Sequence, residues 1–312
     1  MSASPNGAAN GSAAASPSTQ QPAASPEPSI SWPVNRPASR GKWTPEVDHE
    51  IRLREQKDVR TPTNPQTTAA PGFPVSAKDL LPGQPRSLSG IGTRAFVLGQ
   101  ALGLSLAGAL YLAAVSHNPA WRASFFVAVL STFHFLEFWT TARYNTPAAK
   151  TASFLLTNGK EYQVAHSAAL LEHLITRFFF ANWHEKATFG GLTAVLGIAL
   201  IALGQVVRSV AMAQAGTNFN HMVQSRKNSG HELVTDGVYA WLRHPSYFGF
   251  FWWGLGTQLM LGNIVCLLGY AAVLWRFFSS RIRHEEKFLI NFFGDEYREY
   301  RARTTVAIPF IP

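Results

Sequence analysis

Charged residues and cysteine are both scarce in this chain. Only 14% of its 312 residues are charged and 46% are hydrophobic, whereas a soluble domain usually carries about 25% charged residues. This deficit argues against an ordinary soluble domain and favours a membrane protein. The formal net charge is +9, but no stripe of basic residues with interleaved aromatics accompanies it. We therefore interpret the positive charge as a topological bias and expect no nucleic-acid partner.

Cysteine-based sites are excluded almost entirely. Cys266 is the only cysteine, so the chain has no intramolecular disulfide and no zinc cluster built on cysteines. Three histidines lie close together in the sequence, at His221, His231 and His244. They lack a carboxylate or cysteine framework, and we expect no metal site.

The N-terminal 88 residues lack a periodic apolar face. They are rich in Ser, Ala, Pro, Gly and Thr, and such a segment cannot bury enough apolar surface to offset the entropy lost on ordering. We predict that residues 1–88 form a disordered tail. Because the first residues are small and polar, we also expect no signal peptide there.

Six apolar stretches follow the tail. They run at about 95–115, 123–142, 162–181, 189–212, 246–262 and 263–280. A membrane-spanning helix needs roughly 20 apolar residues, so we predict an all-α, polytopic membrane protein with about six transmembrane helices. The third stretch contains His166, Glu172, His173 and Arg177. It spans the membrane only if these side chains face other helices or the membrane surfaces.

The basic residues between the stretches favour one orientation. If both chain ends are cytosolic, the lumenal loops contain only Arg122 and Lys186 as basic residues. Cytosolic loops normally carry the excess of Lys and Arg. We therefore predict that the long polar loop after the fourth stretch and the C-terminal tail both face the cytosol.

The polar loop is the first candidate site. Residues 214–250 are too polar to span a membrane and are dense in Gly, Asn, His and aromatic residues. Pro245 disfavours a helical conformation at His244, which predicts a bend just before the fifth stretch. The alternative is an ordinary cytosolic loop without a ligand.

The second candidate site is the sequence RIRHEEKF at residues 281–288. Arg281, His284 and Glu285 are spaced i, i+3 and i+4, so they share one face if the sixth helix continues, and Glu286 points elsewhere. The alternative is a surface ion pair, worth well under about 1 kcal/mol, or a set of topological anchors.

These two regions resemble the isoprenylcysteine carboxyl methyltransferase family. The matching segments are GTNFNHMVQ, HELVTDGVY, RHPSYFGFFWW, RIRHEE and FFGDEYREYRARTTVAIPFI. The resemblance implies methyl esterification, dependent on S-adenosyl-L-methionine, of the C-terminal carboxylate of prenylated cysteine on CaaX-processed proteins. It also implies a multi-pass enzyme of the endoplasmic reticulum membrane whose active site faces the cytosol.

The resemblance also implies the site residues. The cofactor-binding residues would be Gln224, His231, Glu232, Leu233, Val234, Tyr239, His244, Pro245, Ser246, Tyr247 and Glu285. Arg281 would bind the substrate carboxylate and, with Glu285, act in catalysis. On this basis residues 89–213 hold the first transmembrane helices, and residues 214–312 form the cofactor-binding and catalytic region with the last helical hairpin.

The residue types suit this chemistry. A terminal carboxylate has a pKa of about 3.5 and is ionised near neutrality, so its methylation requires no strong general base. An arginine can hold a carboxylate through two parallel hydrogen bonds, and an aromatic ring can face a cationic sulfonium.

Three other functions remain open from the sequence. Another membrane methyltransferase, acting on lipid amines or small amphiphiles, would use the same loop. An NADPH-dependent sterol reductase is similar in outline, but the run Phe248-Gly249-Phe250 contains no acidic residue and disfavours it. A membrane scaffold or receptor would bind no cofactor.

Overall fold

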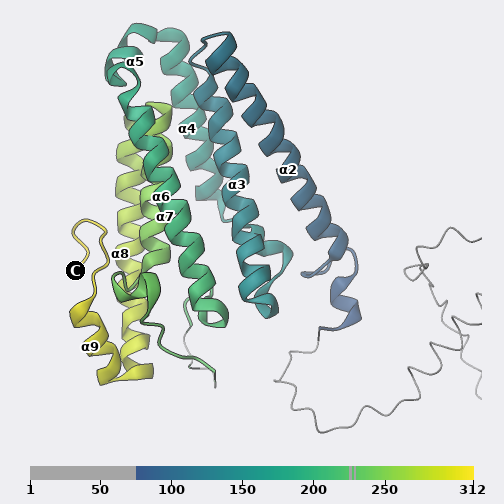
Figure 1. The fold of residues 1–312 in the computed structure, drawn as a ribbon, viewed down its shortest axis with the longest axis vertical. Coiled ribbons are helices and arrows are strands. Elements are labelled where there is room, and N and C mark those ends of the chain that lie inside the picture. Colours follow the sequence, from purple (N-terminus) through teal and green to yellow (C-terminus); the bar gives the residue numbers. More distant parts are fainter. Residues whose placement is uncertain (1–74, 225–226, 228–229) are drawn as a thin grey trace, which may run out of the picture. The chain divides into compact units, whose positions relative to one another are not determined.

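The computed structural model describes residues 75–224, 227 and 230–312 (Figure 1). Most of the predicted disordered tail lies outside the described residues. In its described part, Ala77–Leu80 form a short 3-10 helix (η1), and the first long helix begins at Leu88. Within the described residues the only β-type pairing is an isolated bridge between Leu242 and Thr305. The predicted all-α class is confirmed.

A long helix occupies each of the six apolar stretches. These helices are α2 (Leu88–Leu110), continued by the π-helical turn η2 (Tyr111–Val115), then α3 (Trp121–Tyr144), α4 (Lys160–Phe179), α6 (Leu192–Ala215), α7 (Pro245–Leu261) and α8 (Val265–Phe293). Shorter helices connect or follow them: η3 (Thr146–Ala148), η4 (Thr151–Phe154), α5 (Ala181–Ala187), η5 (Phe189–Gly191), η6 (Gly216–Asn218), η7 (Gly237–Ala240) and α9 (Asp295–Arg303).

Four of the long helices are long and apolar enough to cross a membrane. They are α2 with η2, α3, α6 and α8. Helix α7 has only 17 residues, and α4 carries several charged residues. The membrane class is therefore supported by the helices themselves, whereas the count of six spans and their orientation remain predictions.

Polar side chains of α4 face neighbouring helices. His166 Nδ1 lies 2.7 Å from the hydroxyl of Tyr270 on α8, and His173 Nδ1 lies 2.7 Å from the carbonyl oxygen of Leu261. The carboxylate of Glu172 accepts N–H bonds from the first residues of α8, where the partial positive charge of a helix N-terminus favours an anion. For His166, Glu172 and His173, these contacts meet the condition that the sequence set for a membrane-embedded α4.

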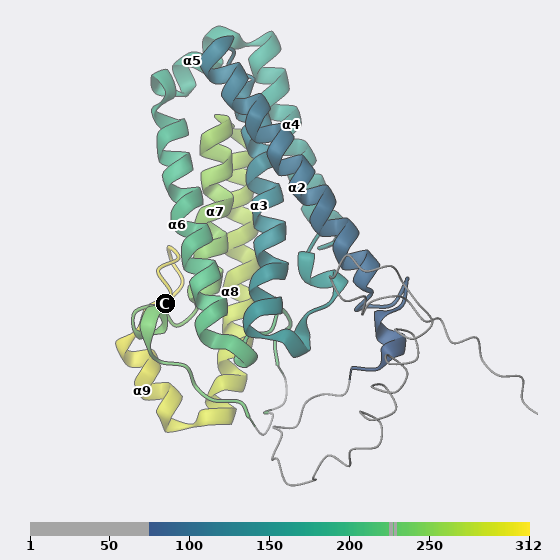
Figure 2. The same cartoon turned by 45° about the vertical axis from the view of Figure 1, so that its right-hand side comes forward.

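Helices α6 and α7 lie side by side (Figure 2). They pack closely because glycines lie at their interface. A Cβ atom added at Gly256 would lie 2.8 Å from the carbonyl oxygen of Gly197, and one at Gly249 would lie 2.6 Å from that of Gly204. Small residues permit such close approach of helices in a membrane. The end of α6 is thereby held against the beginning of α7, on either side of the polar loop.

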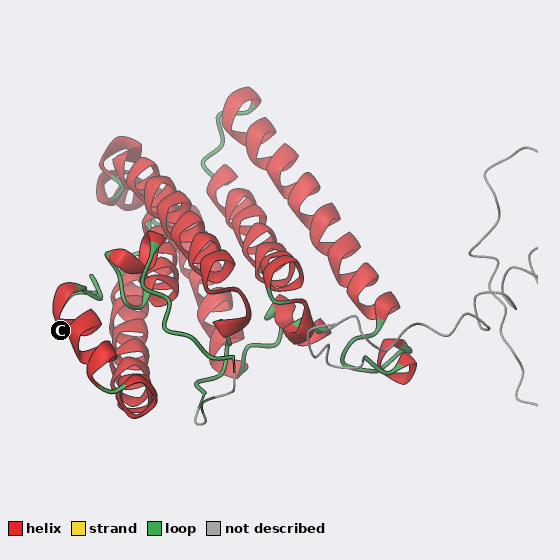
Figure 3. Ribbon diagram, turned by 60° about the horizontal axis from the view of Figure 1, so that its bottom comes forward, coloured by secondary structure: helices red, strands yellow, loops and turns green. Residues whose placement is uncertain are grey.

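The C-terminal segment returns along α7 and α8. Val306, Ile308 and Ile311 are buried in a cluster with side chains of those two helices. Seen from the end of the bundle at which this segment starts, α9 and the α6–α7 loop lie beside the end of α8 (Figure 3). The polar loop and the RIRHEEKF sequence therefore meet at one end of the molecule.

Candidate active site

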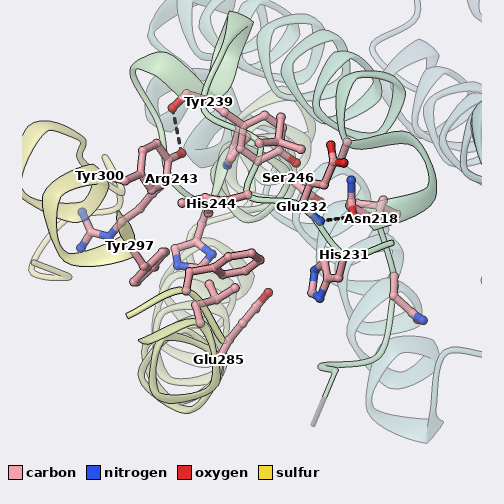
Figure 4. A pocket seen from close by; sticks show the side chains of 18 of the residues that line it. Asn218, His231, Glu232, Tyr239, Arg243, His244, Ser246, Glu285, Tyr297 and Tyr300 are labelled. Atoms are coloured by element: carbon pink, nitrogen blue, oxygen red, sulfur yellow. Dashed lines mark hydrogen bonds between the residues drawn. The ribbon is translucent and has the colours of Figure 1, made fainter. Parts of the chain in front are cut away.

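A cleft opens between the α6–α7 loop, the first turn of α7, and helices α8 and α9 (Figure 4). It encloses about 710 Å³ of empty space, including the part open to solvent. A smaller cavity of about 340 Å³ adjoins it and shares Asn218, Asn220, His231, Glu285 and Leu289 with it. Both cavities have polar and apolar walls, as a site for an amphipathic ligand requires.

The structure brings the predicted site residues together around these two cavities. The main cleft is lined by His231, Glu232, Leu233, Val234, Tyr239, His244, Pro245, Ser246, Tyr247 and Glu285. Gln224 lines the adjoining cavity. Arg281 lines neither cavity but contacts Tyr247 at the cleft's edge. The α6–α7 loop and the end of α8, which are about 60 residues apart in the sequence, thus form one site.

The local fold explains how the loop presents these side chains. His244 has φ −129° and ψ 57°, outside the helical region, and Pro245 is the first residue of α7, which confirms the predicted bend. The ring of His244 then stacks on that of Tyr247, with 5.5 Å between ring centroids. Gly237 adopts a positive φ of 56°, and the next N–H, that of Val238, donates to Gln214 Oε1 of α6 at 2.9 Å.

Arg281 and Glu285 are linked through one phenol hydroxyl. Arg281 Nε donates to the Tyr247 hydroxyl at 2.8 Å, and that hydroxyl donates to Glu285 Oε2 at 2.6 Å. Helix α8 continues to Phe293, so the two residues share a face as predicted. The cleft's edge therefore carries a cation and an anion held a fixed distance apart.

Glu286 has a different environment from its neighbour. Its carboxylate is buried, and Oε1 accepts from Arg243 Nε at 2.6 Å and lies 3.4 Å from His244 Nε2. Oε2 lies 3.4 Å from Arg301 Nε on α9. Glu286 therefore fixes the bend before α7 and the start of the C-terminal segment, and the prediction that it points away from Arg281 and Glu285 is confirmed.

Several lining residues were not predicted as site residues from the sequence. They are Ala215, Asn218, Phe219, Asn220, Arg243, Leu289, Phe293, Tyr297 and Tyr300. Asn218 Oδ1 accepts the N–H of Glu232 at 3.1 Å, and Tyr300 donates to the carbonyl oxygen of Tyr239 at 2.8 Å. The i, i+3 spacing of Tyr297 and Tyr300 in DEYREY was the available signal for the α9 residues.

Burial shapes the ionisation of the loop and of α9. Desolvation raises the pKa of Tyr239, Tyr297 and Tyr300, so all three remain neutral hydroxyls. Desolvation lowers the pKa of His231, Lys227 lowers it further, and Glu285 opposes the shift. His231 is consequently neutral near pH 7. Among the described residues, no three His, Cys, Asp or Glu side chains are placed to hold a metal ion.

The fold and the site define an integral membrane protein with a polar ligand cleft at one end of a helical bundle. The model of the isoprenylcysteine carboxyl methyltransferase family matches residues 196–291, which include most of the cleft. The chain is 52% identical over 190 residues to protein-S-isoprenylcysteine O-methyltransferase of Saccharomyces cerevisiae, covering 60% of this chain and 79% of that relative. It is 47% identical over 198 residues to the Schizosaccharomyces pombe protein of the same name, covering 60% and 83%.

A solved structure agrees with these sequence matches. The eukaryotic intramembrane Ras methyltransferase, an isoprenylcysteine carboxyl methyltransferase, superposes with a TM-score of 0.66 and 32% sequence identity. The superposition covers 86% of this chain and 88% of that structure. The chain belongs to the isoprenylcysteine carboxyl methyltransferase family.

Proposed function

We propose that this protein esterifies the C-terminal carboxylate of prenylated cysteine on CaaX-processed proteins, with S-adenosyl-L-methionine as methyl donor. The observation that carries the proposal is the Arg281–Tyr247–Glu285 linkage at the mouth of a mixed polar and apolar cleft. Family membership favours this acceptor over the lipid amines of the alternative methyltransferase.

The cleft residues fit the chemistry of S-adenosyl-L-methionine. The Glu285 carboxylate can accept hydrogen bonds from an ammonium or hydroxyl group, and Leu233 and Val234 supply apolar wall. The faces of Tyr239 and Tyr247 suit an adenine ring or a sulfonium. When bound, S-adenosyl-L-methionine would supply the methyl group. The substrate carboxylate oxygen would take this methyl in an in-line displacement, and the electron pair of the broken S–C bond would remain on sulfur.

Arg281 is the residue that we assign to the substrate carboxylate. Its Nε and Nη2 are engaged by Tyr247 and by the carbonyl oxygen of His221. Among the described residues, Nη1 makes no hydrogen bond. Its N–H groups and the second N–H of Nη2 can therefore donate to the substrate carboxylate. The guanidinium is thus oriented before the substrate arrives. Because the acceptor is already ionised, orientation rather than proton removal is what the site must provide.

The surroundings of Arg281 suit a lipid-bearing substrate. Phe277, one turn before Arg281 on α8, is 51% exposed, and Val273 is 64% exposed. In a protein whose α8 is apolar enough to span a membrane, such side chains face lipid. A prenyl chain in the bilayer can therefore lie beside α8 with its carboxylate at Arg281. Each CH₂ of that chain contributes about 0.8 kcal/mol to its transfer from water into the membrane, which concentrates the substrate beside α8. We place the protein in the endoplasmic reticulum membrane with the cleft facing the cytosol.

An acceptor panel tests the proposal. Membranes containing the protein are incubated with methyl-labelled S-adenosyl-L-methionine and N-acetyl-S-farnesylcysteine, its carboxamide, or unprenylated N-acetylcysteine. We expect label only in the farnesylated free acid. Comparable labelling of the carboxamide or of the unprenylated compound would overturn the assigned acceptor.

A further inference from the structure

A buried ion pair lies between α3 and α6, outside both cavities. Arg208 of α6 donates through Nε to Glu137 Oε1 and through Nη2 to Glu137 Oε2 at 2.8 Å. The side chains are only 8% and 1% exposed. Removing two charges from water costs about as much as their attraction returns. The ion pair therefore adds little net stability to the fold. Its other hydrogen bonds indicate a different role for it.

Each member of the pair makes a further contact toward the candidate site: Arg208 reaches the cleft residue Ser246, and Glu137 reaches His221 in the α6–α7 loop. Arg208 Nη1 donates to the hydroxyl of Ser246 at 2.9 Å and to its carbonyl oxygen at 3.2 Å, in the first turn of α7. Glu137 Oε2 lies 2.9 Å from His221 Nε2. One contact thus leads to the side of the cleft formed by α7, and the other leads to the loop after α6.

His221 connects the buried pair to Arg281. Its side chain contacts Glu137, while its carbonyl oxygen accepts from Arg281 Nη2. Asn145, at the end of α3, holds the same stretch of loop by donating to the carbonyl oxygen of Phe219 at 2.9 Å. The backbone at residue 221 is therefore fixed to α3 on one side and fixes the guanidinium on the other.

We propose that His221 is a positioning residue for the methyl acceptor. Its hydrogen bond to Glu137 holds the carbonyl group that orients Arg281, and so aligns the substrate carboxylate without touching it. This inference rests on the proposed function, because it assigns Arg281 to the acceptor. It adds that the alignment is set from inside the helical bundle, by the buried charges on α3 and α6.

Two substitutions of His221 separate positioning from simple packing. His221→Leu keeps similar bulk but removes the hydrogen bond to Glu137, whereas His221→Gln restores an N–H donor at a similar reach. His221 is partly exposed, so both variants of the full-length protein should fold. The matched control is His117→Leu: His117 is exposed, lies between η2 and α3, and lines neither cavity.

The assay measures kcat and KM for N-acetyl-S-farnesylcysteine and, separately, the Kd for S-adenosyl-L-methionine. For His221→Leu we expect kcat/KM to fall on the order of tenfold to a hundredfold, the loss that misalignment of reacting groups brings. Its cofactor Kd should stay within about twofold, an energy difference of about 0.4 kcal/mol. His221→Gln should recover most of the activity, and His117→Leu should match wild type.

Three results would overturn the inference. Wild-type kinetics in His221→Leu would show that the contact has no effect on turnover. Loss of cofactor binding in the same variant would show a structural role for the whole loop. Failure of His221→Gln to recover activity would show that the hydrogen bond is not the cause. An inert wild-type protein would instead remove the proposed function, and this inference with it.

Discussion

Replacing Arg281 with lysine keeps the charge but removes the geometry on which the proposal depends. The arginine donates to the hydroxyl of Tyr247 and to the carbonyl oxygen of His221, with its Nη1 group still available to a ligand. A single ammonium cannot make these contacts and also hold a carboxylate through two parallel bonds. Loss of a buried, charged hydrogen bond costs about 2–5 kcal/mol.

Arg281 is only partly buried, so solvent screening places the expected cost at the lower end, about 2–3 kcal/mol. That range corresponds to a decrease in kcat/KM of about 30- to 150-fold. The assay is methyl transfer to N-acetyl-S-farnesylcysteine over a range of acceptor concentrations, with cofactor affinity measured separately. Arg283→Lys is the matched control, because Arg283 is exposed and, among the described residues, donates only to the carbonyl oxygen of Ser279 in its own helix.

The reasoning fails if Arg281→Lys retains wild-type kcat/KM. It also fails in its division of roles if the variant binds the acceptor normally and instead loses the cofactor. Equal losses in Arg281→Lys and Arg283→Lys would point to a general effect of basic residues on α8.

Three further predictions follow from other parts of the site and fold. Glu285→Gln should weaken cofactor binding by about tenfold, as expected for losing one hydrogen bond to a charged group, and leave acceptor binding unchanged. Calorimetric titration with each ligand tests this, and weakened binding of the acceptor in place of the cofactor would contradict it. Folding lowers the pKa of His231 below its usual value of about 6.5. The contribution of neutral His231 to the stability of the folded protein is therefore complete above pH 6.5, and it is lost as the pH falls through the folded-state pKa. Cofactor affinity should fall over the same range, since His231 then adds positive charge beside Lys227, and a flat affinity–pH profile would contradict this. Gly256→Val should destabilise the α6–α7 interface by about 1–3 kcal/mol, seen as a lower melting temperature in detergent. Gly269→Ala should leave the melting temperature unchanged, because no atom of the described part of the chain lies within 4 Å of the added Cβ.

Features set by local sequence were predictable. The step from His244 to Pro245 fixes a bend, and the helical period separates Glu285 from Glu286, so their different environments follow from a continuous α8. The six helices follow from apolar run length. Run length and composition do not identify α7 or α4 as membrane-spanning helices, because α7 is short and α4 carries charged residues.

Features that depend on long-range packing were not predictable. Glu137 and Arg208 lie 71 residues apart, and no spacing rule pairs two single charges within separate apolar runs. Tyr297 and Tyr300 reach the cleft only because the chain turns at Gly294, with φ 58°. The sequence indicates a turn at that glycine but does not give the direction that the chain takes after it.

The identity of the methylated group is the central claim, and product analysis tests it most directly. The purified protein, in lipid, would receive S-adenosyl-L-methionine and a farnesylated peptide with a free C-terminal cysteine, and the product would be fragmented by mass spectrometry. The proposed function predicts one added methyl group, on the α-carboxylate of the prenylated cysteine, which mild base removes. A methyl group on nitrogen or on a lipid headgroup, or no methylated peptide, would contradict it.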